Sequence, residues 1–204
     1  MDILKTLGDL QRNEKATDVG DLQSVYYNKI APSTKEADYL NVTTGWVYAC
    51  TNVISDEVAK IDLKLYRKKG DKTEEITTHP VLDLLNRANN FTTKNDLFWL
   101  TSNYLEMTGE APWFVLKKGN TPSQIFLIRP DKLTVKAGQG EDFIDGYSYR
   151  NDKGADIDID ADELIFIKYP NPTNPFRGMG TLQAAAKIYD IEEFSENYNK
   201  NFFH

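Results

Sequence analysis

The segment RGMGTLQAAAKI, residues 177–188, places two glycines and a threonine in front of a stretch that reads as a helix. Backbone N–H groups at a helix start can bind a phosphate, so this segment is a candidate nucleotide site. It lacks the Gly-Lys-Ser/Thr end of the phosphate-binding loop and the three spaced glycines of a dinucleotide site. We therefore predict that Gly178 and Gly180 permit a tight bend and that Thr181 caps the following helix.

The segment DIDIDADE, residues 156–163, spaces three aspartates like the first, third and fifth ligands of a calcium loop. The rest of that loop is absent, because Ala161 occupies the position of its glycine and Ile167 that of its glutamate. Strict alternation predicts instead a strand with one polar and one apolar face. The polar face comprises Asp156, Asp158 and Asp160, and the apolar face Ile157 and Ile159.

The other candidates for chemistry are isolated. GDKT, residues 70–73, has no glycine at the distance that a phosphate-binding loop requires, so we interpret it as a hairpin turn. The last predicted helix carries three acids at a spacing of three: Asp190, Glu193 and Glu196. A solvated helix face explains them better than acid–base catalysis does. Cys50, which we expect to be buried, has only His79 and His204 with which to bind a metal. We predict no catalytic, cofactor-binding or metal-binding residue, and no enzyme.

The net charge of -7 comes from one segment, since residues 141–163 contain nine acids and two bases and the rest of the chain is balanced. Without a basic face the chain is a poor candidate for tight binding of DNA, because affinity for phosphates depends on Lys and Arg. No stretch is long and apolar enough for a membrane span, and the first residues do not form an export signal. With 40% hydrophobic and 27% charged residues, the composition is that of a globular protein.

Positioning these residues requires helices in the first half of the chain. Residues 1–40 predict a short helix followed by an extended, partly mobile arm. Residues 41–61 predict an amphipathic helix that begins at Thr43 or Thr44. Its expected core-facing stripe comprises Trp46, Val47, Cys50, Val53, Ile54, Val58 and Ile61.

A strand, a turn and two further helices follow. Residues 63–69 alternate as a strand does, and Pro80 stands where a short helix can begin. The clearest helix spans residues 92–109, because Thr93 and Asp96 have the spacing of a capping box and Gly109 that of a C-terminal cap.

After Gly109 the period changes from helical to alternating, which predicts five or six short strands joined by tight turns. The fold class is therefore α+β, an antiparallel sheet of short strands with packed helices, followed by a long C-terminal helix. We divide the chain into an N-terminal arm (1–40), an α+β domain (41–176) and the start of the last helix (177–204).

Five segments in order resemble the portal proteins of tailed bacteriophages, in the branch named after the Hong Kong phage. They are WVYACTNVISDEVAKIDLKLYRK, HPVLDLLNRANNFTTKNDLFWLTSNYLEMTGEAPWFVLKK, IFLIRPDKLTV, DELIFIKYPNP and FRGMGTLQAAAKIYDIEEFSENYNKNFF. The resemblance covers residues 44–204. The chain departs from the family pattern after the glycine. Glu110 replaces a small polar residue, and Pro112 and Trp113 stand where the family often has an asparagine, an alanine and a tyrosine. These differences concern local detail.

The resemblance implies that residues 41–176 are a portal wing and that residues 177–204 begin a helix directed toward a stem. Family members continue well beyond the Phe-Phe pair at the end of this chain, which therefore looks like a front half. Portals form rings, usually of twelve copies, at one vertex of the capsid. Double-stranded DNA passes through the ring without tight binding, both into the capsid and out of it.

The implied partners are further copies of the chain, terminase, capsid and scaffold proteins, and tail or adaptor proteins. The implied location is the virion, with assembly in the host cytoplasm. The acidic segment 141–163 would either meet a basic surface of a neighbouring copy or line the channel. Two alternatives stay open: a small α+β enzyme that binds a metal or nucleotide, and a head–tail adaptor that is not the portal.

Overall fold

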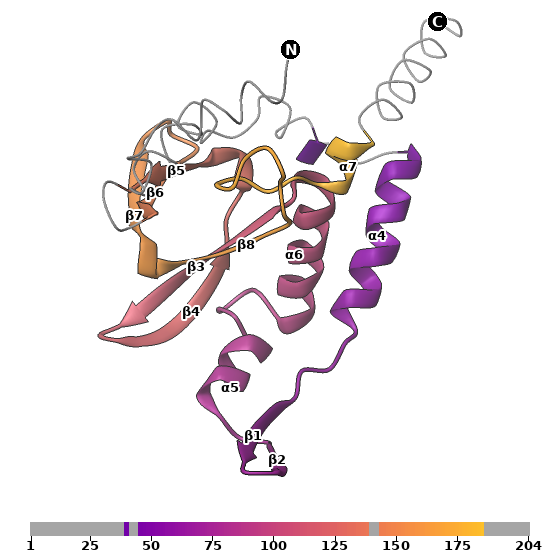
Figure 1. Ribbon diagram of the computed structural model, residues 1–204, viewed down its shortest axis with the longest axis vertical. Helices are drawn as coiled ribbons and strands as arrows, with labels where there is room; N and C mark the ends of the chain where they lie inside the picture. Colours follow the sequence, from indigo (N-terminus) through magenta and orange to yellow (C-terminus); the bar gives the residue numbers. More distant parts are fainter. Residues whose placement is uncertain (1–38, 41–44, 139–142, 186–204) are drawn as a thin grey trace, which may run out of the picture.

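The computed structural model describes residues 39–40, 45–138 and 143–185, and Figure 1 shows their arrangement. The predicted arm, residues 1–40, and the predicted helix beyond residue 185 lie almost wholly outside the described residues. The described part is an α+β fold, as expected, in which helices lie beside short antiparallel sheets. No helix among the described residues is long and apolar enough to cross a membrane.

α5 and α6 begin where local sequence signals place them. α5 (Pro80–Asn86) starts at Pro80, and the His79 side chain accepts a hydrogen bond from the Val81 N–H at 3.2 Å. α6 (Lys94–Thr108) has the predicted capping box between Thr93 and Asp96, each side chain satisfying the other residue's backbone N–H. Gly109 ends the helix in the left-handed conformation with φ 80°, which a glycine adopts without steric cost.

α4 (Gly45–Ala59) is a helix, but the prediction of its buried face is wrong. Its buried residues are Thr51, Ser55 and Ala59, spaced four apart, and they face α6. Small side chains in this row let the two helices approach closely, which decides the packing more strongly than the number of apolar residues does. The predicted stripe is largely exposed, with Trp46 at 81%, Val53 at 64%, Ile54 at 43% and Ile61 at 62%. Cys50, expected to be buried, is also exposed.

The strands form three antiparallel sheets. β1 (Leu65–Lys69) and β2 (Lys72–Ile76) form a separate hairpin. The six strands after Gly109 divide into two sheets of three, where the sequence predicted a single sheet. One has the order β4–β3–β8, comprising Thr121–Leu127, Glu110–Lys118 and Leu164–Lys168. The other has the order β5–β6–β7, comprising Leu133–Ala137, Ile144–Arg150 and Asp156–Asp160.

The sheet β4–β3–β8 is the centre of the fold because each of its faces lies against a hydrophobic core. Trp113, Val115 and Ile125 on one face pack with Leu97 of α6 and with residues of α5. Leu164 belongs to the second core, together with Leu133, Val135, Tyr147 and Ile159 of the sheet β5–β6–β7, and Phe114 and Phe166 pack against it. The layers therefore run from α4 through α6 to the two sheets (Figure 1). This stack brings the end of α6, the start of β3 and the chain after β8 to one place.

Candidate functional site

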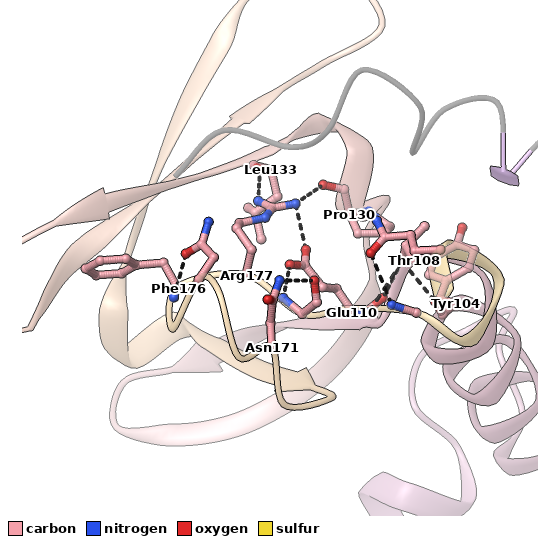
Figure 2. Close-up of polar contacts among 12 residues, drawn as sticks. Tyr104, Thr108, Glu110, Pro130, Leu133, Asn171, Phe176 and Arg177 are labelled. Atoms are coloured by element: carbon pink, nitrogen blue, oxygen red, sulfur yellow. Dashed lines mark hydrogen bonds and ion pairs between the residues drawn. The ribbon is translucent and has the colours of Figure 1, made fainter. Parts of the chain in front are cut away.

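The segment Arg177–Gly180 connects the sheet domain to α7 (Thr181–Ala184) and is held by the residues around Gly109. Figure 2 shows Arg177 and Glu110 pointing toward each other, with Pro130 and Leu133 close to the guanidinium. Glu110 is 0% exposed and Arg177 is 4% exposed, so both charges are removed from water. This buried polar cluster is the candidate functional site of the described chain.

The two charges are paired and bonded to the backbone. The Arg177 Nη2 lies 2.6 Å from the Glu110 Oε2. The guanidinium also donates to the carbonyl oxygens of Leu133, at 2.6 Å, and Pro130, at 3.3 Å. The Gly178 N–H donates to the other carboxylate oxygen of Glu110 at 2.5 Å. Because a buried charge is tolerated only when paired and hydrogen-bonded, this network ties the bend to the starts of β3 and β5.

The glycines of the bend are required by the close approach of other backbone, which the sequence did not indicate. Neither Gly178 nor Gly180 has a positive φ. A Cβ on Gly178 would lie 2.7 Å from the Gly109 carbonyl carbon, and one on Gly180 would lie 2.7 Å from the Met107 carbonyl oxygen. Gly109 is equally confined, since its Cβ would lie 2.5 Å from the Gly180 backbone nitrogen. The three glycines let the bend and the end of α6 pack backbone against backbone.

The helix start is also built differently from the prediction. Gly180 is the N-cap, and the side-chain oxygen of Gln183 accepts a hydrogen bond from its N–H at 3.3 Å. Thr181, predicted as the cap, is the first helical residue and is exposed. The carboxylate of Glu110 already accepts from the Gly178 N–H, and its negative charge repels a phosphate that would approach the same donor. The Gly178 N–H is therefore already bonded within the chain.

Polar groups of the loop 171–176 hold the bend from its other side. The Asn171 side-chain amide donates to the Gly178 carbonyl at 3.2 Å, and the Asn174 side chain accepts from the Phe176 N–H at 3.0 Å. The Tyr169 N–H donates to the Gly109 carbonyl at 2.9 Å, and the Lys168 amine donates to the Pro175 carbonyl. Burial lowers the pKa of the Lys168 amine, and the carboxylate of Glu110 opposes this shift.

Sequence reasoning missed the central pair of this site. Arg177 stood in the quoted glycine segment without a role, and Glu110 was noted only as a departure in a family pattern. The available signal was a charged residue placed directly after a helix-ending glycine at the start of an apolar strand, because such a position predicts a buried carboxylate that needs a partner.

The aspartate strand β7 presents a charged face of the sheet, and two of its aspartates pair with bases of the same sheet. Asp156 lies 3.0 Å from Arg150 of β6, and Asp158 lies 2.7 Å from Lys136 of β5. The hydrogen bond from Arg150 lowers the pKa of Asp156. Among the described residues no group of His, Cys, Asp and Glu is arranged to hold a metal ion. Ile159 is buried as predicted, whereas Ile157, on the same face, is 48% exposed at the open end of the sheet.

The structure does not unite the other candidate residues with this cluster. GDKT forms the predicted hairpin turn, with Gly70 at φ 61°. His79 caps α5, and Cys50 lies on the exposed side of α4. The acids at 190, 193 and 196 and His204 lie outside the described residues.

Comparison with known proteins gives the fold a context. A family model described as "Phage portal protein" matches residues 46–204. A protein of Rickettsia bellii (strain RML369-C) with the description "Uncharacterized protein" is 26% identical over 159 residues, which are 75% of this chain and 40% of that protein.

Two solved structures contain chains of similar fold. In the neck of an empty GTA particle computed with C6 symmetry, the TM-score is 0.73 at 20% identity, over 84% of this chain and 47% of that one. In the neck of a native GTA particle computed with C12 symmetry, the TM-score is 0.69 at 20% identity, over 85% and 46%. The chain spans less than half the length of each of these proteins.

Proposed function

Because the chain belongs to the phage portal protein family, we propose that it is the front half of a portal subunit that assembles with copies of itself into a ring. The match of the family model to residues 46–204 carries this proposal, and it covers nearly all of the residues on which the sequence resemblance rests. The family is one of structural proteins, in agreement with the prediction that the chain is not an enzyme.

The proposed ring contains twelve copies and sits at one vertex of the capsid. A chain of similar fold in a particle neck computed with C12 symmetry supports this arrangement. Double-stranded DNA would pass through the ring during packaging and ejection, and the ring would contact terminase, capsid and scaffold proteins, and then tail or adaptor proteins. The acidic balance of the chain supports passage of DNA without tight binding, because like charges repel.

The buried cluster gives the bend a mechanical role in this proposal. The body of the wing and the helix after Gly180 would belong to different parts of a portal, and residues 177–180 are the stretch of chain that joins them. The ion pair between Glu110 and Arg177 and the backbone contacts of three glycines make this link stiff. We infer that the cluster sets the direction in which the chain leaves the wing toward a stem.

The alternative functions have less support. An enzyme that binds a nucleotide or a metal would use the N–H of Gly178 and the aspartates at 156 and 158. The N–H instead donates to Glu110, and the aspartates form ion pairs with bases of the chain. A head–tail adaptor of another family is disfavoured by the family match.

The test is negative-stain electron microscopy of the purified product of the complete reading frame. Rings with a central hole, together with a stability that rises with protein concentration, are expected for a portal subunit. A product that stays monomeric at high concentration, or whose melting temperature rises only with magnesium or a nucleotide, would contradict the proposal.

A further inference from the structure

The hairpin β1–β2 projects from the body of the chain without a core of its own. Figure 1 shows it at the lower end of the molecule, beyond α5 and away from both three-stranded sheets. None of the ten residues in its two strands is buried. An isolated two-stranded hairpin is marginally stable in water, so this one is expected to gain stability from a partner.

The tip of the hairpin carries positive charge that no ion pair among the described residues neutralises. Residues 67–72, RKKGDK, contain four bases and one acid. Lys69 and Lys72 stand directly opposite each other in the register, an arrangement that is unfavourable for like charges. Within the described part of the chain, Lys68, Lys69 and Lys72 form no ion pair, whereas Lys64 at the base of the hairpin lies 3.6 Å from Glu75. The tip therefore presents three lysines for an acidic surface.

An acidic surface of this kind lies at one end of the sheet β5–β6–β7. Four acids of the segment 141–163 have basic partners of their own: Asp152, Asp156, Asp158 and Asp162. Three others form no ion pair among the described residues: Asp145, Asp160 and Glu163. The register pairs Asp160 with Gly146, the residue after Asp145, and Glu163 follows within the short helix η3 (Ala161–Glu163). The backbone thus gathers three unpaired acids at one end of the sheet.

One copy cannot bring these two surfaces together. The hairpin and the sheet β5–β6–β7 lie on opposite sides of the sheet β4–β3–β8 and its helices in Figure 1. Complementary patches at different places on one molecule produce a head-to-tail contact between copies, and such contacts form a ring when the rotation from copy to copy closes. Ile61 and Tyr66 at the base of the hairpin are 62% and 51% exposed, which suits a protein partner better than a phosphate backbone.

We propose that the hairpin β1–β2 of one copy binds the next copy in the ring, with Lys68, Lys69 and Lys72 against Asp145, Asp160 and Glu163. The inference rests on the proposed ring and specifies which surfaces form it. Charged contacts at the rim of an interface act mainly on the rate and the partner choice of association, so assembly should weaken with salt.

Charge reversal and its compensation test the contact in the product of the complete reading frame. One variant carries K68E, K69E and K72E, a second carries D145K, D160K and E163K, and a third carries all six. Lys118→Glu is the matched control, because Lys118 is an exposed lysine beside the turn of another hairpin, β3–β4, and forms no ion pair with any residue that the structure describes. The readouts are the protein concentration at half-assembly, from mass photometry, and ring counts in negative stain.

Each triple variant is expected to raise the half-assembly concentration by about tenfold or more, and the sixfold variant to return it to within about threefold of the unaltered protein. Lys118→Glu should leave it unchanged. Melting temperatures close to that of the unaltered chain are expected for the hairpin variant, since no altered side chain is buried.

If the unaltered protein forms rings and the hairpin variant forms them equally well, the contact is overturned and the portal proposal stands. A sixfold variant that assembles no better than either triple variant would likewise overturn it. Absence of rings from the unaltered product would overturn the portal proposal and the contact together.

Discussion

Replacing Arg177 with methionine is expected to lower the free energy of unfolding by about 3 to 5 kcal/mol, because it leaves the buried carboxylate of Glu110 without its counter-ion. The variant keeps most of the side-chain volume, so loss of packing contributes little. It also removes the guanidinium donor from the Leu133 carbonyl, which costs about 1 kcal/mol within that total. Glu110 retains the hydrogen bond from the Gly178 N–H, which keeps the effect from being larger.

The reciprocal change, Glu110→Gln, should cost less, about 2 to 3 kcal/mol. The amide oxygen of glutamine can still accept from Gly178, and the Arg177 charge keeps the carbonyl oxygens of Leu133 and Pro130. The double variant should be more stable than the sum of the two single effects predicts, since residues in direct contact are not additive.

Urea denaturation and thermal melting of the chain measure these effects, and a loss of 3 to 5 kcal/mol corresponds to a fall in melting temperature of roughly 6 to 20 °C. Arg150→Met is the matched control: Arg150 also pairs with an aspartate, but its side chain is 68% exposed, so a much smaller loss of stability than that of Arg177→Met is expected. If Arg177→Met is no more destabilising than Arg150→Met, the conclusion that the buried pair stabilises the bend is wrong.

Three further predictions concern the glycines, a surface ion pair and the aspartate strand. Gly178→Ala should lower the free energy of unfolding by about 3 kcal/mol or more, because the new methyl group meets backbone that cannot move aside, whereas Gly119→Ala, in open space at φ 59°, should cost about 1 kcal/mol in the same thermal melts. The hydrogen bond from Lys117 lowers the pKa of Asp162 below 3.8. This pair therefore stabilises the fold above pH 3.8, and the stabilisation is lost as the pH falls through the lowered pKa. In Lys117→Gln, an NMR titration of the carboxyl groups should show the pKa of Asp162 closer to 3.8. Magnesium or calcium at millimolar concentration should shift the melting temperature by less than about 1 °C, and a rise of several degrees would restore the metal-site interpretation of the aspartate strand.

Much of the local structure could be predicted because it depends on neighbouring residues. The capping box needs only an Asp three positions after Thr93, and the C-terminal cap needs only a glycine after the last helical turn, and the structure confirms both. Alternation after Gly109 predicted the short strands, because side chains of a strand point to opposite faces. The buried face of α4 could not be predicted in this way, since the choice between its apolar stripe and its row of small residues depends on the surface of α6.

The sequence by itself therefore determined the class of the fold, the positions of most of its helices and strands, and a resemblance that the family match confirms. It did not predict β2, which lies where the sequence indicated a turn. Only the tertiary structure shows how six strands divide into two sheets, and that the glycine segment packs against the backbone at the end of α6. Gly178 and Glu110 are 68 positions apart, and nothing local distinguishes a glycine that turns the chain from one that makes room for another backbone. Only the packing of α6, β3 and the chain after β8 brings these residues into contact. Because burial removes the competing water, the charges of Glu110 and Arg177 must pair with each other.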